Sequence, residues 1–454
     1  MMRYLGLLIF LLVQSCAGYS QEIIGTWLGK LDFGAQKLTF VVHISQVNGK
    51  WMAKADSPDQ GTFGIPFQID VKGDSVLLKN PQGIKLALKK INDDKLAGKF
   101  AQNGIEIPIE LTRTTETSAA KKIEKYQTPK PPYTYDTLDV SFPNKYANIN
   151  LAGTITSSKG EGKYPAVILL TGSGQQDRDE TLFGHKPFKV LADYLTRNGI
   201  IVLRFDDRGA GQSGGSFETS TIDDFSKDAI SALEFLKQQK YVDKNKIGII
   251  GHSEGGLVAN LLAGQGIPNV SFIVTLAAPT VPIRDLMVEQ LYSVGKAEGM
   301  SEFQLAMARD INKKNFDVVK SDLPTEEAYA QLKKNMNILE ETDKNAAIRK
   351  EILMLLTPAY RYFMRINPQE FIKNIYIPVF GAFGTLDVQV PSTLNLRGYN
   401  DYLPKNSKTV LKEYENMNHL FQKAKTGRVA EYAELAETIN EQVLKDITDW
   451  IKGL

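Results

Sequence analysis

The stretch that most constrains the fold is Gly251-His252-Ser253-Glu254-Gly255, which stands between an apolar run and a helix-like segment. The run before it, residues 247–250, consists of three β-branched isoleucines and Gly248, and the segment after it, residues 257–262, favours a helix. This order predicts a strand, a tight turn and a helix. The glycines remove the Cβ atoms that would collide in such a turn. The sequence therefore predicts Ser253 on a strained backbone, presented above a sheet as a nucleophile.

The N-terminus has the layout of a signal peptide. Arg3 precedes the apolar residues 4–13, and small or polar residues follow up to Ser20, which predicts a signal peptide over residues 1–20. An alternative is a lipobox-like site at residues 13–16, in which Cys16 would be lipidated. Cys16 is the only cysteine, so the mature chain has no intramolecular disulfide. We expect an exported protein, periplasmic or secreted, or lipid-anchored through Cys16.

Length and charge set further bounds. At 454 residues the chain predicts two or more domains. The formal net charge of +2 gives no basic excess for gripping phosphate backbones, which argues against a nucleic-acid partner. No later segment is long and apolar enough to span a bilayer. The sequence does not specify an oligomeric state.

Residues 22–113 have a β pattern. Leu38, Phe40, Val42 and Ile44 alternate with their neighbours at a period of two, and Asn48-Gly49 is a hairpin signal. Short strands at even spacing predict a small antiparallel domain, either a lipocalin-like barrel or a sandwich. His43 falls on the face opposite the apolar row, and a structural role is expected for it.

Residues 114–132 form a predicted Pro-rich linker. Over residues 133–454 the chain alternates buried apolar runs with amphipathic helices, which predicts a doubly wound, mostly parallel α/β sheet. Helices are expected at residues 187–197 and 221–239, and a last one at about 431–451. The polar, helical residues 279–374 interrupt the alternation and predict a helical cap over the carboxyl ends of the strands.

A serine nucleophile needs a base, and the base needs an orienting carboxylate. The chain has four histidines. His252 lies inside the turn and is expected to point away from Ser253. His419 is the one histidine that comes after Ser253 in the chain, just past the last predicted strand, and is therefore the expected base. Asp387 follows the strand before that, at a position from which it can reach the His419 ring. Asp285 is the competing acid, although a surface role suits it better.

The oxyanion needs two N–H donors. One is the N–H of Glu254 at the start of the helix. The other is expected in the glycine-flanked loop of residues 171–174, where Ser173 is the best-placed donor and Gly174 an alternative.

Five segments together carry a resemblance to a known superfamily: residues 171–180, 204–213, 251–255, 386–391 and 418–419. With them the chain resembles the α/β-hydrolase superfamily, and is most similar to bacterial carboxylesterases near the dienelactone hydrolase and serine aminopeptidase branches. The resemblance implies Ser253 as nucleophile, His419 as base, Asp387 as orienting acid, and Ser173 and Glu254 as oxyanion donors. Thr171 departs from it, because many relatives have histidine there.

The residues beside these motifs are expected to be structural. Asp177, Arg178, Asp179 and Glu180 should form a charge network that braces the oxyanion loop, and Arg208 should stabilise its own turn.

The leading hypothesis is an exported serine esterase that cleaves small-molecule esters, preferably with short acyl groups, and needs no metal or organic cofactor. One alternative is a peptidase or aminopeptidase with the same triad, which would need an acidic cluster at the pocket. Another, of a different class, is a carbohydrate- or lipid-binding module with a vestigial hydrolase domain.

Overall fold

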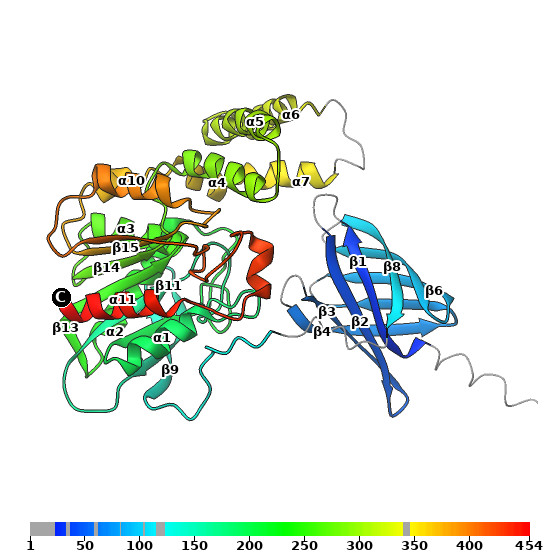
Figure 1. The fold of residues 1–454 in the computed structure, drawn as a ribbon, viewed down its shortest axis with the longest axis horizontal. Coiled ribbons are helices and arrows are strands. Elements are labelled where there is room, and N and C mark those ends of the chain that lie inside the picture. Colours follow the sequence, from blue (N-terminus) through cyan, green and yellow to red (C-terminus); the bar gives the residue numbers. More distant parts are fainter. Residues whose placement is uncertain are drawn as a thin grey trace, which may run out of the picture. The chain divides into compact units, whose positions relative to one another are not determined.

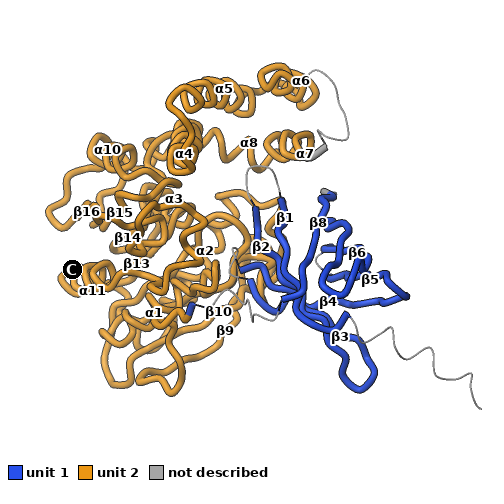
Figure 2. Tube along the Cα trace, turned by 45° about the vertical axis from the view of Figure 1, so that its right-hand side comes forward, with its two compact units in different colours: residues 1–123 blue, residues 124–454 orange. Residues whose placement is uncertain are grey.

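The computed structural model describes residues 23–32, 37–58, 62–81, 83–102, 105–114, 123–338 and 346–454. The chain divides into two compact units, residues 1–123 and 124–454 (Figure 2). The predicted signal peptide and Cys16 lie outside the described residues. None of the helices within these ranges combines the length and apolar character that a membrane crossing requires.

The first unit is a closed antiparallel barrel (Figure 1). Each strand pairs with the next along the chain, and the last pairs back with the first. The strands are β1 (Gly25–Asp32), β2 (Lys37–Val47), β3 (Lys50–Ser57), β4 (Thr62–Lys72), β5 (Ser75–Lys79), β6 (Lys85–Asn92), β7 (Lys95–Gln102) and β8 (Ile105–Thr114). The barrel prediction is therefore confirmed over its sandwich alternative.

The alternation along β2 explains how the barrel fills its interior. Leu38, Phe40, Val42 and Ile44 are buried in one apolar cluster with residues of the other strands. His43 points to the other face, where its ring nitrogens contact Thr26 Oγ1 and Asp56 Oδ2 at 3.1 and 2.8 Å. The expected structural role of His43 fits these contacts.

The second unit is built on one sheet of eight strands, in the order β16-β15-β14-β13-β11-β12-β10-β9. Strand β10 runs antiparallel to both of its neighbours, and all other neighbouring pairs are parallel. The strands are β9 (Asp136–Asn144), β10 (Ile149–Ser157), β11 (Tyr164–Leu170), β12 (Ile201–Phe205), β13 (Val242–His252), β14 (Phe272–Leu276), β15 (Val379–Gly384) and β16 (Val410–Tyr414). This is the predicted, mostly parallel α/β-hydrolase sheet.

Helices connect and cover these strands. Helix α1 packs on β12 and α3 packs on β14, and both strands are buried along their whole length. The covering helices are α1 (Pro187–Arg197), α2 (Ile222–Lys237), α3 (Glu254–Gly264), α10 (Ser392–Tyr402) and α11 (Glu441–Gly453). Helix α1 has the limits that the sequence predicts.

A run of helices separates β14 from β15. These helices pack on one another, and α4 to α7 lie together on one side of the sheet in Figure 1. They are α4 (Ile283–Ala297), α5 (Glu302–Lys320), α6 (Thr325–Asn335), α7 (Ala346–Leu355), α8 (Pro358–Arg365) and α9 (Gln369–Ile372).

The prediction of one helix over residues 431–451 is wrong before Glu441. The chain forms a short 3-10 helix, η4 (Val429–Glu434), and an irregular segment before α11 begins. The reason is a tertiary contact: the side chain of Gln127 accepts hydrogen bonds from the N–H groups of Thr438 and Ile439. The side chain of Asn440 then caps α11 by accepting from the N–H of Gln442.

Candidate active site

Ser253 sits on the turn between β13 and α3. Its φ and ψ are +52° and −116°, a conformation that residues other than glycine rarely adopt. The glycines on either side make the turn possible. A Cβ atom on Gly251 would lie 2.2 Å from the carbonyl oxygen of Gly255, and one on Gly255 would lie 2.2 Å from that of Leu170. Strain of this kind persists only where the surroundings impose it, as at functional sites.

His419 and Asp387 form a buried pair on the loops that follow β16 and β15. Nδ1 of His419 lies 2.7 Å from Oδ2 of Asp387, and each residue is 5% exposed. The other carboxylate oxygen accepts from the N–H groups of Gln389 and Val390, both at 2.8 Å. Because a carboxylate accepts, Nδ1 of His419 carries the proton, and Nε2 is left as the basic nitrogen. The competing acid Asp285 instead lies in α4 and pairs with Arg284.

The turn that carries Ser253 contacts this pair. Its chain neighbour His252 packs its ring against that of His419, with 4.7 Å between ring centroids. Within the described residues, no hydrogen bond joins the Ser253 hydroxyl to the His419 ring. Such contacts are often long in free enzymes and shorten when substrate binds.

The loop after β11 lies against the turn. A Cβ atom on Gly172 would lie 3.4 Å from that of Ser253. The N–H groups of Ser173 and Glu254 donate to no other group in the described part of the chain. Both N–H groups are therefore available to a ligand. At the same place, burial raises the pKa of the Glu254 carboxyl, and a hydrogen bond with the Ser173 side chain offsets part of the effect.

The charge network expected over residues 177–180 forms in part: among the contacts of the described residues, Glu180 binds the loop directly, whereas Arg178 and Asp179 pair with residues outside it. Arg178 pairs with Asp206, and Asp179 pairs with Arg204 and Lys186. Glu180 accepts a hydrogen bond of 2.9 Å from the N–H of Gly172.

His252 has a link that the sequence did not reveal. It was expected only to point away from Ser253, but its Nδ1 lies 2.8 Å from Glu180 Oε1 and its Nε2 lies 3.0 Å from the carbonyl oxygen of His419. The two partners are 72 and 167 residues away along the chain. No local pattern signals contacts at such separations.

A cavity of about 40 Å³ is lined in part by the loop after β11. That volume has room for about three water molecules. Its walls are the start of α3, the loop at Gly172 and Gly174, and an apolar set made of Leu170, Phe205, Phe217, Phe225 and Val258. Phe217 and Phe225 stack with 5.4 Å between ring centroids.

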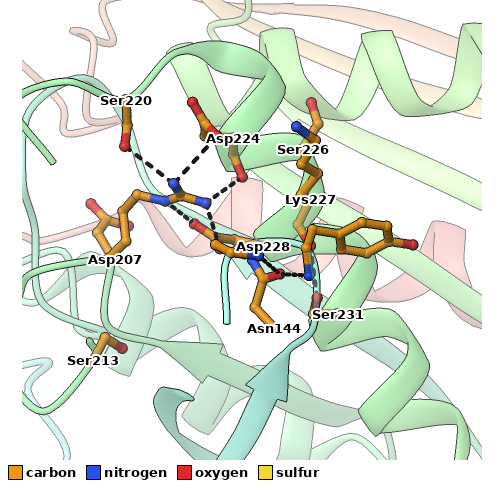
Figure 3. Close-up of polar contacts among 12 residues, drawn as sticks. Asn144, Asp207, Ser213, Ser220, Asp224, Ser226, Lys227, Asp228 and Ser231 are labelled. Carbon is orange, nitrogen blue, oxygen red and sulfur yellow. Dashed lines mark hydrogen bonds and ion pairs between the residues drawn. The ribbon is translucent and has the colours of Figure 1, made fainter. Parts of the chain in front are cut away.

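Acidic residues line the same cavity. Burial raises the pKa of Asp207 to about 7, although Thr171 and the N–H of Gln176 donate to its carboxylate. Asp228 accepts two hydrogen bonds from Arg208, at 2.7 and 2.9 Å, and another from Asn144 (Figure 3). Arg208 also donates to Ser220 and to the backbone of Asp224, and thereby holds its loop to α2.

His185 lies under the segment that follows His419. It is fully buried, and its ring nitrogens contact Thr438 Oγ1 and the carbonyl oxygen of Tyr432, both at 2.9 Å. Burial lowers its pKa to about 4, against about 6.5 in an unfolded chain. Between these values the unfolded state binds a proton that the folded state does not, so stability falls as the pH drops.

We therefore expect the free energy of unfolding to fall by about 2 kcal/mol more in the wild type than in His185→Gln between pH 7.5 and pH 5. Urea unfolding followed by circular dichroism at 222 nm measures it, because the helices lie in the second unit. Equal falls in both proteins would contradict a neutral, buried His185.

Among the described residues, no group of three or more His, Cys, Asp or Glu side chains is arranged to hold a metal ion.

The chain is similar to several known proteins. Residues 186–420 match the family described as serine aminopeptidase, S33. The chain is 26% identical to esterase EstD of Thermotoga maritima over 317 residues, which cover 68% of each chain. It is 32% identical to the inactive dipeptidyl peptidase 10 of Rattus norvegicus over 74 residues, 15% of this chain and 9% of that one. Among solved structures, the Pyrococcus furiosus esterase Pf2001 aligns at a TM-score of 0.43 and 17% identity, over 72% of this chain and 96% of that one.

Proposed function

This chain belongs to the serine aminopeptidase, S33, family, and on that basis we propose that it is an exported serine esterase for small carboxylic esters with short acyl groups. Ser253 is the nucleophile, His419 the general base and Asp387 the residue that orients His419. Backbone N–H groups of Ser173 and Glu254 stabilise the oxyanion. No step requires a metal or an organic cofactor.

The reaction proceeds in two halves. Nε2 of His419 takes the hydroxyl proton as Ser253 Oγ attacks the ester carbonyl, and the oxyanion accepts hydrogen bonds from the two N–H groups. When the tetrahedral intermediate collapses, the proton passes to the alcohol, which leaves, and Ser253 keeps the acyl group. His419 then activates a water molecule, which releases the carboxylic acid and restores Ser253.

The observation that carries this proposal is the buried His419–Asp387 pair at 2.7 Å, on loops at the same edge of the sheet as the strained Ser253. A buried histidine whose Nδ1–H is bound by a carboxylate and whose Nε2 is left basic suits a general base. The relation to EstD, which is described as an esterase, favours esters as substrates.

The test is a fluorophosphonate probe together with a series of p-nitrophenyl esters. We expect the probe to label Ser253 and the series to favour acetate to butyrate. Unlabelled Ser253 would reject the esterase and instead support a ligand-binding protein with a vestigial hydrolase domain. Acetylated sugars and feruloyl esters, run beside the series, would identify the alcohol and acyl classes.

The short-acyl preference rests on the small cavity and on α4 to α9, which we propose cap the site. Replacing Phe217 with alanine removes a stacked ring from the cavity wall. The ratio of kcat/KM for hexanoate to that for acetate should rise about tenfold or more, as expected for added room in an apolar pocket. Phe303→Ala is the control, because Phe303 is 74% exposed on α5. An unchanged ratio in Phe217→Ala would place the acyl group elsewhere.

A second candidate is an aminopeptidase, favoured by the family's description and by Asp207 and Glu254 at the cavity. An ionised carboxylate there would bind a peptide amine. Because burial raises the pKa of both residues, the neutral ester remains the better fit. Turnover of aminoacyl anilides without turnover of p-nitrophenyl acetate would reverse this choice.

Export rests on the N-terminal sequence alone. If residues 1–20 are removed as a signal peptide, the mature protein begins at Gln21, which N-terminal sequencing of protein recovered outside the cytoplasm would detect. A lipid-modified N-terminus at Cys16 would instead support the lipoprotein alternative.

A further inference from the structure

Three segments that the proposed mechanism needs in register meet at one buried pair of side chains, Glu180 and His252. Glu180 binds the oxyanion loop at Gly172, and His252 binds the backbone of the base, His419. The two side chains bind each other at 2.8 Å. They are 2% and 6% exposed.

The partners of His252 define its charge. A carbonyl oxygen only accepts, so Nε2, which faces the carbonyl of His419, must carry a proton. Nδ1 faces Glu180 Oε1, which already accepts from the N–H of Gly172 and acts toward Nδ1 as a carboxylate acceptor. Nδ1 therefore carries a proton as well, and the ring is an imidazolium.

Electrostatics agree with that assignment. Burial alone would lower the pKa of His252, but the charge and hydrogen bond of Glu180, together with the His419 carbonyl and the charge of Asp387, raise the pKa above its ordinary value. A buried pair of this kind is held tightly, because removing either charge would leave the other without a partner.

The backbone at Glu180 is also constrained. Its φ is +54°, in the left-handed region that glutamate rarely adopts. The carboxylate nevertheless reaches both the oxyanion loop and His252, so the surrounding structure holds a strained residue in this place.

We propose that Glu180 and His252 are positioning residues, an ion pair that fixes the base His419 relative to the oxyanion loop. Neither touches the reacting atoms. The inference rests on the proposed function, because it assigns these residues to the same site. Its value to catalysis is geometric, since a displacement of about 1 Å between reacting groups can cost about a hundredfold in rate.

The first test measures the charge without reference to activity. In protein labelled with ¹⁵N-histidine, His252 should show protons on both ring nitrogens, with its signals assigned by their loss in His252→Gln. In Glu180→Gln, one of the two protons should be lost. A single ring proton on His252 in the wild type would overturn the proposal, whether or not the protein hydrolyses esters.

The second test separates positioning from general stability. Glu180→Gln and His252→Gln should each lower kcat for p-nitrophenyl acetate by about 10- to 100-fold, with KM within about twofold, because substrate contacts remain. The double variant should be no slower than the slower single variant, since each change breaks the same link.

The matched control is Asp179→Asn. It neutralises the carboxylate next to Glu180, which pairs with Arg204 and Lys186 but with neither the oxyanion loop nor His252. Its kcat should stay within about threefold of the wild type. Glu180→Gln with a wild-type kcat, or a loss in Asp179→Asn as large as in Glu180→Gln, would overturn the positioning role. A wild type that cleaves no ester would instead reject the esterase, leaving the charge test to decide the ion pair.

Discussion

Replacing His419 with alanine is expected to lower kcat/KM for p-nitrophenyl acetate by about four to six orders of magnitude. Without the imidazole, the Ser253 hydroxyl has no base to take its proton, and the leaving alcohol has no acid to protonate it. Stopped-time assays with concentrated enzyme measure the residual rate. Asp387→Asn should also be severely impaired, because His419 loses the carboxylate that holds its Nδ1–H at 2.7 Å.

His43→Gln is the control for this series. His43 is a half-buried histidine on the barrel, bonded to Thr26 and Asp56 and far from Ser253 in sequence. Its replacement should leave the rate within about twofold of the wild type. A near-wild-type rate in His419→Ala would mean that another group serves as the base, and the assignment of the pair would fail.

Replacing Gly251 with alanine is expected to lower the free energy of unfolding by about 3 kcal/mol or more. The new Cβ would lie 2.2 Å from the carbonyl oxygen of Gly255 and 2.6 Å from the amide nitrogen of Gly256. Both are backbone atoms, so no side chain can rotate to relieve the clash. The turn that carries Ser253 would have to shift, and kcat should fall with stability. Urea unfolding and ester assays measure the two effects.

Gly453→Ala provides the comparison. Gly453 ends α11, and a Cβ atom there would meet no other atom within 4 Å. Alanine favours helices over glycine by about 1 kcal/mol, so this variant should be as stable as the wild type or slightly more so. If Gly251→Ala were equally stable, the turn would have more freedom than its contacts allow.

Much of this fold is legible in the sequence, because its elements follow local patterns. The period of two along residues 38–44 and the turn at Asn48-Gly49 predict the hairpin of β2 and β3. The apolar runs before residues 171 and 251 predict β11 and β13. Helix α1 is found with its observed limits, because Pro187 begins it and Asn198-Gly199 ends it. In each case the deciding interactions lie within a few residues.

What the sequence does not show depends on contacts between distant residues. Closure of the barrel requires β1 to pair with β8, at the far end of the unit. The late start of α11 depends on Gln127, more than 300 residues away. The pair of Glu180 with His252 joins two loops that only the sheet brings together. Nothing in the sequence around His252 indicates that its ring will bind the carbonyl group of His419.

The contacts of residues 124–127 bear on how the role of the barrel can be studied. Lys125 donates to the carbonyl groups of Ala433 and Leu435, and Gln127 binds the backbone at Thr438 and Ile439. Residues 124–127 are thus hydrogen-bonded to the segment that follows His419, although the sequence predicts that they belong to the linker between domains. A deletion variant that begins at Tyr133 would lose these hydrogen bonds together with the barrel. A deletion variant that begins at Glu124 would remove the barrel and keep these hydrogen bonds, so it would measure the contribution of the barrel to activity by itself.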